Sequence, residues 1–333
     1  MYSSSPNAPD VSIVVPVFDE EESLPQLTEE IRAVCERAGY SFEVWLVDDG
    51  SQDGSWEVIE RLHAADERYR GIRFRRNYGK SAALSIGFQH ARGRYVVTMD
   101  ADLQDDAAEI PRLVEALEEG RGYDLVSGWK QKRHDPLEKR VPSKFFNYVT
   151  RKMSGIPLHD FNCGLKGYRN EVVKSVRVYG ELHRFIPLLA KWEGYGRITE
   201  RVVNHRPRVH GRTKFGLERY LRGFLDLISV VFLTRFAARP MHFFGTLGTL
   251  AFMGGFFVSL WITIDKLVFH QPIGDRPLLL FGVLLILLGA QMFSVGLLGE
   301  MFIRRDMERT SAYQIRETLG PKPREVGPAA PIG

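Results

Sequence analysis

Two long stretches without a charged side chain constrain the fold of this chain more than any other feature of its sequence. Neither Met241–Ile264 nor Pro277–Gly299 contains Asp, Glu, Lys or Arg. Each is longer than the ~20 apolar residues with which an α-helix crosses the hydrocarbon layer of a bilayer. A pair of helices buried in a soluble core is the alternative, but two consecutive charge-free runs of this length are rare there. We therefore expect two transmembrane helices within residues 240–304.

Basic residues flank these two apolar runs on one side of the expected pair. Arg235 and Arg239 precede the first run, and Arg304 and Arg305 follow the second. Lys and Arg accumulate on the cytoplasmic side of membrane helices, so both chain ends and the preceding domain are expected in the cytoplasm, most simply at a bacterial inner membrane. Glycines recur along both runs and would let the helices pack closely, which also leaves self-association into a homo-oligomer open.

Upstream of the apolar runs, hydrophobic segments of strand length alternate with segments of helical character. Five strands are expected, at residues 11–18, 42–49, 72–77, 95–100 and 125–129. Hydrophobic strands separated by helices predict an α/β domain with a mostly parallel, doubly wound, Rossmann-like sheet that is covered by helices on both faces. We assign residues 1–216 to this domain.

Two further segments surround the expected membrane helices. Residues 217–239 have a basic start and an amphipathic pattern. This pattern suits a helix lying in the membrane interface or, alternatively, an ordinary packed surface helix. Residues 305–333 form a tail that ends GPKPREVGPAAPIG, which we expect to be cytoplasmic and partly disordered.

Charge and cysteine content narrow the classes of partner. The net charge is only +4, and much of the basic excess is concentrated between Arg201 and Arg222. A basic cluster next to a membrane segment favours phosphate groups or anionic membrane lipid, and not nucleic acid, as the partner. The two cysteines, Cys35 and Cys163, are far apart and have no CxxC neighbour, so neither a disulfide framework nor a zinc site is expected.

Acidic residues follow the expected strands at the points where they end. The carboxyl ends of parallel strands meet at one edge of a sheet, where ligands bind in folds of this class. The strongest signal is the run MDADLQD at residues 99–105. The carboxylates of Asp100 and Asp102, with the amide oxygen of Gln104, can share a hard cation such as Mg²⁺ or Mn²⁺ when substrate phosphates complete its coordination. For such a motif taken alone, a solvated acidic turn is the alternative.

Three further motifs accompany this run. VVPVFDEEESL, VDDGSQDGS, RNYGKSAALSIGF and MDADLQD occur in this order, each at the end of an expected strand. Together they resemble glycosyltransferase family 2, inverting enzymes with the glycosyltransferase-A fold. HDFNCGLKGYRNEVV, ELHRFIPLLA, VVNHRPRVHGRTKFG and the two expected spans look like the dolichol-phosphate-mannose-synthase-like branch of that family. Within the branch, the chain is most similar to bacterial polyprenyl-phosphate glycosyltransferases with a two-span membrane anchor.

The resemblance implies a set of residues that bind the nucleotide-sugar donor. They are Pro16, Phe18, Asp19, Glu20, Asp48, Asp49, Lys80, Asp100, Ala101 and Asp102, with Asp49 at the base. Asp102 and Gln104, with Asp100, would hold the Mg²⁺ or Mn²⁺ ion that bridges the diphosphate. For Asp19, Glu20 and Asp48 the alternative is an acidic helix start favoured by the helix dipole. For Lys80 it is a solvated basic face.

The resemblance also implies an acceptor side. A phosphate monoester at a membrane surface requires arginine and lysine, and the candidates are Lys139, Arg140, Ser143, Arg206, Arg208, Arg212 and Lys214. A basic flank held to anionic lipid is the alternative for the last four. Asp160 and the pair Cys163 and Gly164 match the acceptor motif, with Lys166 in the place of the family's arginine. Asp160 is a candidate catalytic base, or it only orients the acceptor, because a phosphate with a second pKa ≈ 6 is already largely ionised at neutral pH.

The expected reaction is a single in-line displacement. The phosphate of undecaprenyl or dolichyl phosphate attacks the anomeric carbon of a hexose, most simply from a UDP-sugar, and nucleoside diphosphate leaves with its charge taken by the metal at Asp102. The lipid-linked sugar would serve cell-envelope glycan modification or glycosylation. The alternatives are a processive synthase, which two spans and the lack of a QxxRW motif disfavour, and a catalytically inactive sugar-nucleotide sensor or scaffold. The intact DADLQD run argues against a sensor or scaffold.

Overall fold

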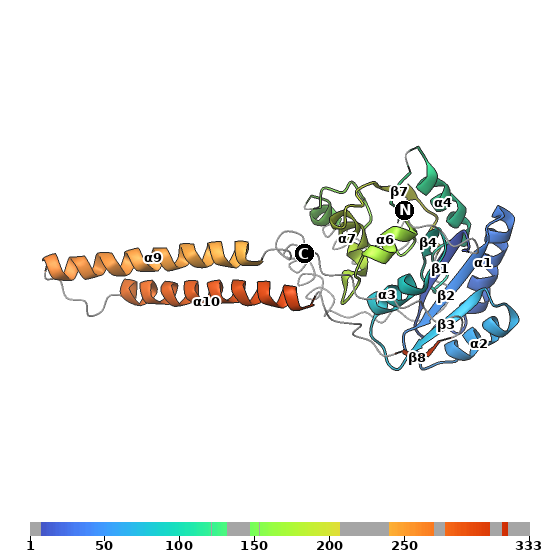
Figure 1. Ribbon diagram of the computed structural model, residues 1–333, viewed down its shortest axis with the longest axis horizontal. Coiled ribbons are helices and arrows are strands. Elements are labelled where there is room, and N and C mark those ends of the chain that lie inside the picture. The colour runs from blue at the N-terminus through green and yellow to red at the C-terminus, as the bar shows by residue number, and fades with distance from the viewer. Residues whose placement is uncertain are drawn as a thin grey trace, which may run out of the picture. The chain divides into compact units, whose positions relative to one another are not determined.

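The computed structural model describes residues 8–120, 122–131, 147–152, 154–206, 240–269, 277–306 and 315–318. Its contacts divide the chain into two compact units, the first comprising Met1–Leu227 with Ser311–Gly327 and the second Ile228–Thr310 with Pro328–Gly333. The described part of the first unit is an α/β domain, and that of the second is a pair of long helices (Figure 1). The predicted amphipathic helix at 217–239 lies outside the described residues.

One sheet forms the centre of the first unit, with eight strands among the described residues in the order β7-β5-β6-β4-β1-β2-β3-β8. Their bounds are β1 Val11–Val17, β2 Phe42–Asp48, β3 Tyr69–Phe74, β4 Tyr95–Thr98, β5 Leu125–Trp129, β6 Lys166–Arg169, β7 Ile198–Val202 and β8 Ile315–Thr318. β4, β1, β2 and β3 are parallel neighbours. β6 lies antiparallel between β4 and β5, and β8 lies antiparallel on β3. The mostly parallel sheet predicted from the sequence is confirmed.

All five expected strands are present, but β3 and β4 end three and two residues earlier than predicted, whereas β1 and β2 each end one residue early. β4 ends at Thr98, because the amide of Asp100 donates to the Asp105 carboxylate, 3.2 Å away, and does not continue the strand. β3 spans residues 69–74 and not 72–77, because the chain after it turns back so that the amides of Tyr78 and Gly79 bond to Asp49. β6 and β7 are short and mix polar with apolar residues, so no hydrophobic run marked them in the sequence.

Helices cover both faces of the sheet (Figure 1). On one face, α1 packs against α2 and α4; on the other, α3 packs against α6 and η2, with α7 following η2. The helix bounds are α1 Leu24–Ala38, α2 Ser55–Ala65, α3 Lys80–His90, η1 Ala107–Glu109, α4 Ile110–Glu118, α6 Asn170–Ser175, η2 Leu182–Phe185 and α7 Ile186–Trp192. This layered arrangement leaves the carboxyl ends of β1, β2 and β4 at a common edge, where the loops predicted to bind the donor begin.

Local sequence explains the central elements. All residues of β1 except Pro16 are buried, as a parallel strand that is covered on both faces requires. In α1, Leu24, Leu27 and Ile31 recur at helical spacing and are buried toward the core. The helix ends at Gly39, whose φ of 72° is a left-handed conformation that favours glycine. Together these segments fix the positions of the loops that follow β1 and β2.

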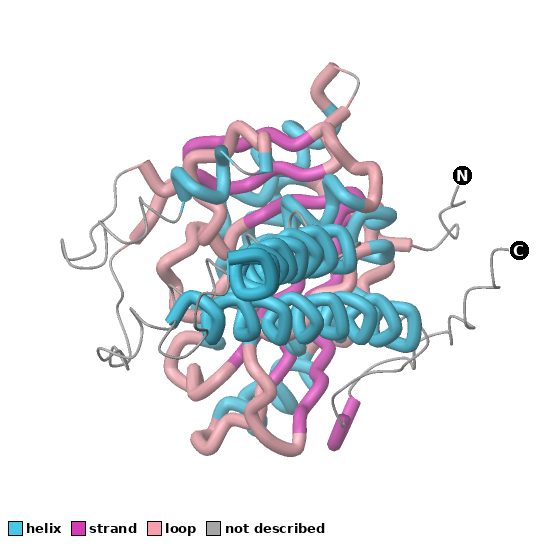
Figure 2. Tube along the Cα trace, turned by 90° about the vertical axis from the view of Figure 1, so that its left-hand side faces the viewer, coloured by secondary structure: helices cyan, strands magenta, loops and turns pink. Residues whose placement is uncertain are grey.

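Two long helices form the described part of the second unit. α9 (Pro240–Phe269) and α10 (Pro277–Asp306) run side by side (Figures 1 and 2). Both are long and apolar enough to cross a membrane. In the most apolar 18-residue stretch of each helix, only 17 % (α9) and 11 % (α10) is buried. Helices in the core of a soluble protein would be mostly buried, so that alternative does not fit the structure.

Glycines set the contact between α9 and α10. Gly248 faces Gly289, and Gly255 faces Gly282. A Cβ atom added at Gly248 would lie 2.7 Å from the carbonyl oxygen of Gly289, and one added at Gly289 would lie 2.5 Å from that of Gly248. The two backbones therefore approach as closely as small residues allow, which is the usual basis of helix association within a bilayer.

The C-terminal tail contains regular structure that the sequence did not indicate. Residues 315–318 form β8, which extends the sheet of the first unit beside β3. The expectation of a partly disordered tail does not include this strand. Pairing at a sheet edge uses backbone N–H and C=O groups, so it leaves little trace in the pattern of side chains.

Candidate active site

Carboxylates tie together the loops that follow β1, β2 and β3. Asp19, after β1, accepts a hydrogen bond from the amide of Gln52, 2.9 Å away. Asp49, after β2, accepts from the amides of Tyr78 and Gly79, at 2.7 and 2.9 Å. The acidic residues at the strand ends thus hold three loops in register at the edge of the sheet where ligands bind in this fold class.

Burial changes the ionisation of the neighbouring carboxylates Asp48 and Asp49. Asp48 is fully buried with its Oδ2 atom 3.3 Å from the Arg73 guanidinium, and burial raises its pKa above the ordinary value. Burial also raises the pKa of Asp49 to about 6, although its two amide hydrogen bonds act in the opposite direction. Asp49 therefore changes charge near pH 6, at the position predicted to contact the nucleotide base.

The remaining predicted donor residues of the first loop lie around the end of β1. Pro16 is half-buried, and Phe18 exposes 37 % of its surface at this edge. The side chain of Glu20 accepts a hydrogen bond from the hydroxyl of Ser23 at 3.0 Å, just before α1 begins. Glu20 thus lies at a helix start, as the alternative interpretation of this residue expects.

Two residues other than glycine have a left-handed backbone at this edge. The φ angle is 54° at Asp19 and 60° at Leu103. A left-handed conformation costs a residue with a Cβ atom about 1–3 kcal/mol, which the surrounding structure has to offset. Leu103 is almost fully buried, so its packing holds it in place. Such strain concentrates at functional sites, and here it marks the loop after β1 and the turn after β4.

The turn after β4, residues 100–106, is called the metal turn below. At its start, the Asp100 carboxylate forms an ion pair with Lys80, the first residue of α3. Burial alone would raise the pKa of Asp100, but the positive charges of Lys80 and Lys130 outweigh burial and lower it to about 2. A Cβ atom at Gly164 would lie 2.6 Å from this carboxylate. The acceptor motif therefore approaches the metal turn at a point where only glycine fits.

Asp102 and Gln104 offer oxygen ligands within the same turn. Ala101 and Asp102 are buried, and the backbone amide of Gln104 donates to Oδ1 of Asp102 at 3.2 Å. Among the residues that the structure describes, no cluster of three or more His, Cys, Asp or Glu side chains could hold a metal ion alone. A carboxylate and an amide oxygen fit a hard cation that takes its other ligands from a diphosphate and water. Asp100 is less suited as a ligand, because Lys80 already neutralises it.

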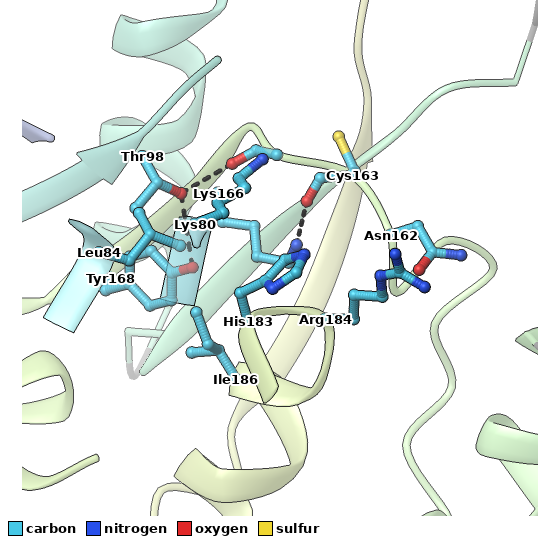
Figure 3. Close-up of a pocket in the computed structure, with 11 residues that line it drawn as sticks. Lys80, Leu84, Thr98, Asn162, Cys163, Lys166, Tyr168, His183, Arg184 and Ile186 are labelled. Carbon is cyan, nitrogen blue, oxygen red and sulfur yellow. Dashed lines mark hydrogen bonds between the residues drawn. The ribbon is translucent and has the colours of Figure 1, made fainter. Parts of the chain in front are cut away.

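A pocket lies beside this ion pair, between α3, β4, β6 and η2 (Figure 3). The positively charged side chains of Lys80 and Arg184 line it, together with the polar side chains of Thr98 and Asn162. Thr98 also donates to the carbonyl oxygen of Gly164 at 2.8 Å, which fixes the acceptor motif against β4. At about 10 Å³ the pocket has room for about one water molecule.

Lys166 supports the acceptor motif from inside the domain. Its Nζ atom donates to the carbonyl oxygens of Phe161, at 3.2 Å, and of Cys163, and burial lowers its pKa. The lysine in the place of the family's arginine thus binds the loop backbone. Asp160, which is buried, accepts a hydrogen bond from the amide of Asn162 at 3.1 Å. This contact orders the loop, and the role of Asp160 as a base stays a prediction.

One of the seven predicted acceptor-phosphate residues lies in the described part of the chain. The Arg206 guanidinium contacts Glu30 of α1 at 2.7 Å and Asp106 of the metal turn at 2.8 Å. Phosphate binding by Arg206 stays a prediction, and it would have to replace at least one of these ion pairs. The other six lie outside the described residues: Lys139, Arg140, Ser143, Arg208, Arg212 and Lys214.

Lys130 and His183 belong to the site although sequence patterns assigned them no role in it. Lys130, directly after β5, forms an ion pair with Asp105 at 2.8 Å, and its position after an expected strand was the available signal. His183 lies 3.0 Å from the Ser81 hydroxyl. Burial and the nearby charge of Lys80 lower the pKa of His183 to about 3, so this imidazole is neutral. No local pattern predicts a contact between α3 and η2.

Comparison with known proteins adds to this geometry. Residues 12–177 match the family described as glycosyl transferase family 2. The chain is 41 % identical over 299 residues to dodecaprenyl-phosphate galacturonate synthase of Rhizobium johnstonii, which covers 89 % of this chain and 88 % of that protein. It is 37 % identical over 293 residues to undecaprenyl-phosphate 4-deoxy-4-formamido-L-arabinose transferase of Pseudomonas syringae. That alignment covers 87 % of this chain and 84 % of the relative.

A solved structure agrees with the fold. Glucosyl-3-phosphoglycerate synthase from Mycobacterium tuberculosis, in complex with Mn²⁺, UDP-glucose and phosphoglyceric acid, aligns with 68 % of this chain and 79 % of its own. The TM-score is 0.50 at 20 % sequence identity. This likeness shows the glycosyltransferase fold of the α/β domain.

Proposed function

Because the chain belongs to glycosyltransferase family 2, we propose that it transfers one sugar from a nucleotide-sugar to a polyprenyl phosphate. Its similarity to dodecaprenyl-phosphate galacturonate synthase carries the choice of acceptor. That alignment spans 299 residues, too many to leave out both α9 and α10. The relationship therefore extends beyond the nucleotide-binding half of the catalytic domain.

The donor side of the proposal rests on the loops at the carboxyl edge of the sheet. Phe18 offers an aromatic surface to the base, and the Asp49 carboxylate accepts hydrogen bonds from base or ribose. Asp102 and Gln104 would hold Mg²⁺ or Mn²⁺, which supplies positive charge to the donor diphosphate and to the nucleoside diphosphate that leaves. Lys80 lies at the same turn, where it holds Asp100 in place.

The acceptor side needs positioning more than proton removal, because a phosphate monoester is largely ionised at neutral pH. A phosphate oxygen attacks the anomeric carbon as the bond from that carbon to the diphosphate breaks, so the anomeric centre inverts. In this proposal Asp160 and Gly164 place the acceptor opposite the leaving group.

The sugar and the nucleotide belong to the same proposal. A UDP-hexose is the donor that we propose. The two relatives are named for different sugars, galacturonate and 4-deoxy-4-formamido-L-arabinose. The product would be a polyprenyl-monophosphate sugar that a later enzyme uses in cell-envelope glycan modification or glycosylation.

We further propose a cytoplasmic catalytic domain at residues 1–216, an interfacial segment at 217–239, two spans within 240–304 and a cytoplasmic tail at 305–333. The arginines at positions 235, 239, 304 and 305 support this topology, because Lys and Arg accumulate on the cytoplasmic side of membrane helices. A single cysteine introduced between α9 and α10 should react with a membrane-impermeant maleimide from the periplasm; labelling only from the cytoplasm would contradict the topology.

Transfer of label tests the proposed function directly. The purified full-length protein in detergent is incubated with polyprenyl phosphate and a panel of labelled UDP-sugars, with and without Mn²⁺ or Mg²⁺. We expect a metal-dependent lipid-extractable product from at least one donor, and loss of that product in Asp102→Asn. Nucleotide binding without transfer from any donor would favour a sensor or scaffold. Label in a water-soluble or polymeric product would contradict the lipid acceptor.

A further inference from the structure

A buried ion pair lies directly behind the metal turn. The Nζ atom of Lys130 is 2.8 Å from Oδ1 of Asp105, and the two side chains are 13 % and 0 % exposed. Oδ2 of Asp105 accepts the hydrogen bond from the amide of Asp100 at 3.2 Å. The Asp105 carboxylate therefore closes the turn and also pairs with the charge of Lys130, which directly follows β5.

A second segment holds the metal turn on its other side. Asp105 pairs through its backbone with His205 in an antiparallel bridge, and the amide of Arg206 donates to the carbonyl oxygen of Gln104 at 2.9 Å. The side-chain amide of Asn204 donates to Asp106 at 3.1 Å. Residues 204–206 therefore support the turn through backbone and side-chain contacts, whereas on the β5 side Lys130 supports Asp105 through one ion pair.

The turn requires such support because of its conformation. Leu103 has a left-handed backbone, and it stands between the two residues that would hold the metal, Asp102 and Gln104. A residue with a Cβ atom leaves that conformation unless its surroundings impose it. Deprived of Lys130, the Asp105 carboxylate would be an unpaired buried charge and would draw in water or move outward. Either change removes its hydrogen bond to Asp100.

We propose that Lys130 is a positioning residue, which holds the metal turn in its metal-binding shape through Asp105 before donor or metal arrives. The inference rests on the proposed function, in that it concerns the residues assigned to the metal. Lys130 does not need to touch substrate for this role. Its Nζ atom is engaged by Asp105. Burial alone would lower the pKa of Lys130, but the surrounding negative charges, with Asp105 foremost, together raise it.

The test uses full-length protein in detergent, first without metal and then with UDP and Mn²⁺. Hydrogen exchange of peptides that cover residues 100–106 reports the turn, and electron paramagnetic resonance of free Mn²⁺ reports metal affinity. We expect Lys130→Met to lose protection in these peptides and to bind Mn²⁺ about ten-fold or more weakly, as loss of an outer-shell partner does elsewhere. Lys130→Arg keeps the charge and should retain protection and affinity within about two- to three-fold.

Two controls keep the result interpretable. The Nζ atom of Lys174 donates to the carbonyl oxygens of Phe88 and Gln89, so Lys174→Met controls for losing a hydrogen-bonded ammonium group away from the turn. The double variant Lys130→Met with Asp105→Asn has no unpaired buried charge. It should fold and still show an unprotected turn.

Three outcomes would overturn the inference. Unchanged turn exchange and Mn²⁺ affinity with a raised KM for polyprenyl phosphate would make Lys130 a substrate ligand. Protection lost equally across the whole domain, in the double variant as well, would make the pair a general structural contact. Normal turn exchange in every Lys130 variant would remove the bracing role. The hydrogen-exchange and Mn²⁺-binding measurements do not depend on whether the wild-type protein transfers sugar, so failure of the proposed function stays distinguishable.

Discussion

Asp49 links the geometry of a single residue to pH. Its pKa of about 6 lies above the ordinary value of 3.8 because the side chain is buried. The folded state therefore holds the proton more tightly than the unfolded state, and this group's contribution to the free energy of unfolding falls between pH 3.8 and about 6 and is constant above. Ionised Asp49 is nevertheless the form that can only accept hydrogen bonds, which a base or ribose would donate.

We predict that kcat/KM for the UDP-sugar donor rises with pH up to about 6 and then levels off, because this ratio reports ionisations of the free enzyme. Below that midpoint it should fall about ten-fold per pH unit. Asp49→Asn should lower the plateau by about ten-fold or more and flatten this limb. An unchanged acid limb in the variant would assign the titration to another group.

Gly164 provides a steric test at a single residue. A Cβ atom there would meet the Asp100 carboxylate at 2.6 Å, so Gly164→Ala should displace Asp100 from Lys80 and lower kcat/KM by about ten-fold or more. Gly196, whose added Cβ would meet nothing within 4 Å, supplies the control Gly196→Ala. Equal activity of the two variants, measured as initial rate of lipid product, would show that this approach tolerates a methyl group.

Individual residues also show how far sequence reasoning reached. The carboxylates at strand ends were predictable, because each follows a hydrophobic run whose end is visible in the sequence. Contacts between distant segments were not predictable. Lys130 meets Asp105, and Ser81 meets His183, only once distant strands and helices are packed. Arg206 was predicted from its residue type for phosphate, but residue type does not reveal that Glu30 and Asp106 already hold its guanidinium.

The helix pair is the element whose packing is most open to test. Gly289 lies against Gly248 so closely that a side chain has no room, whereas Gly254 has nothing within 4 Å of an added Cβ atom. We predict that Gly289→Leu separates α9 from α10 and destabilises their pairing by about 1–3 kcal/mol or more. Gly254→Leu should change it by about 0.5 kcal/mol or less.

Thermal unfolding in detergent, combined with a spin-label distance between the two helices, measures both effects. A longer distance and a lower midpoint in Gly289→Leu alone would support the glycine contact. Indistinguishable behaviour of the two variants would show that the helices do not depend on it. Both helices were predictable from their charge-free runs, but the facing of particular glycines depends on rotation of the helices, which composition does not specify.

At the scale of the whole molecule, strand order and tail placement were the parts that sequence could not supply. The parallel core of β4, β1, β2 and β3 follows from alternating hydrophobic and helical segments. The antiparallel insertion of β6 and the addition of β8 at the far edge depend on backbone pairing between segments remote in sequence.

The identity of the nucleotide released tests the central proposal most directly. Attack on the anomeric carbon breaks the bond between sugar and diphosphate, so each sugar transferred should release one UDP and leave a single phosphate on the lipid product. Chromatography of the nucleotides with phosphorus NMR of the lipid would measure both. We predict UDP and a phosphodiester in equal amounts. Release of UMP with a lipid diphosphate would mean that sugar phosphate is transferred instead, and would contradict the proposed displacement.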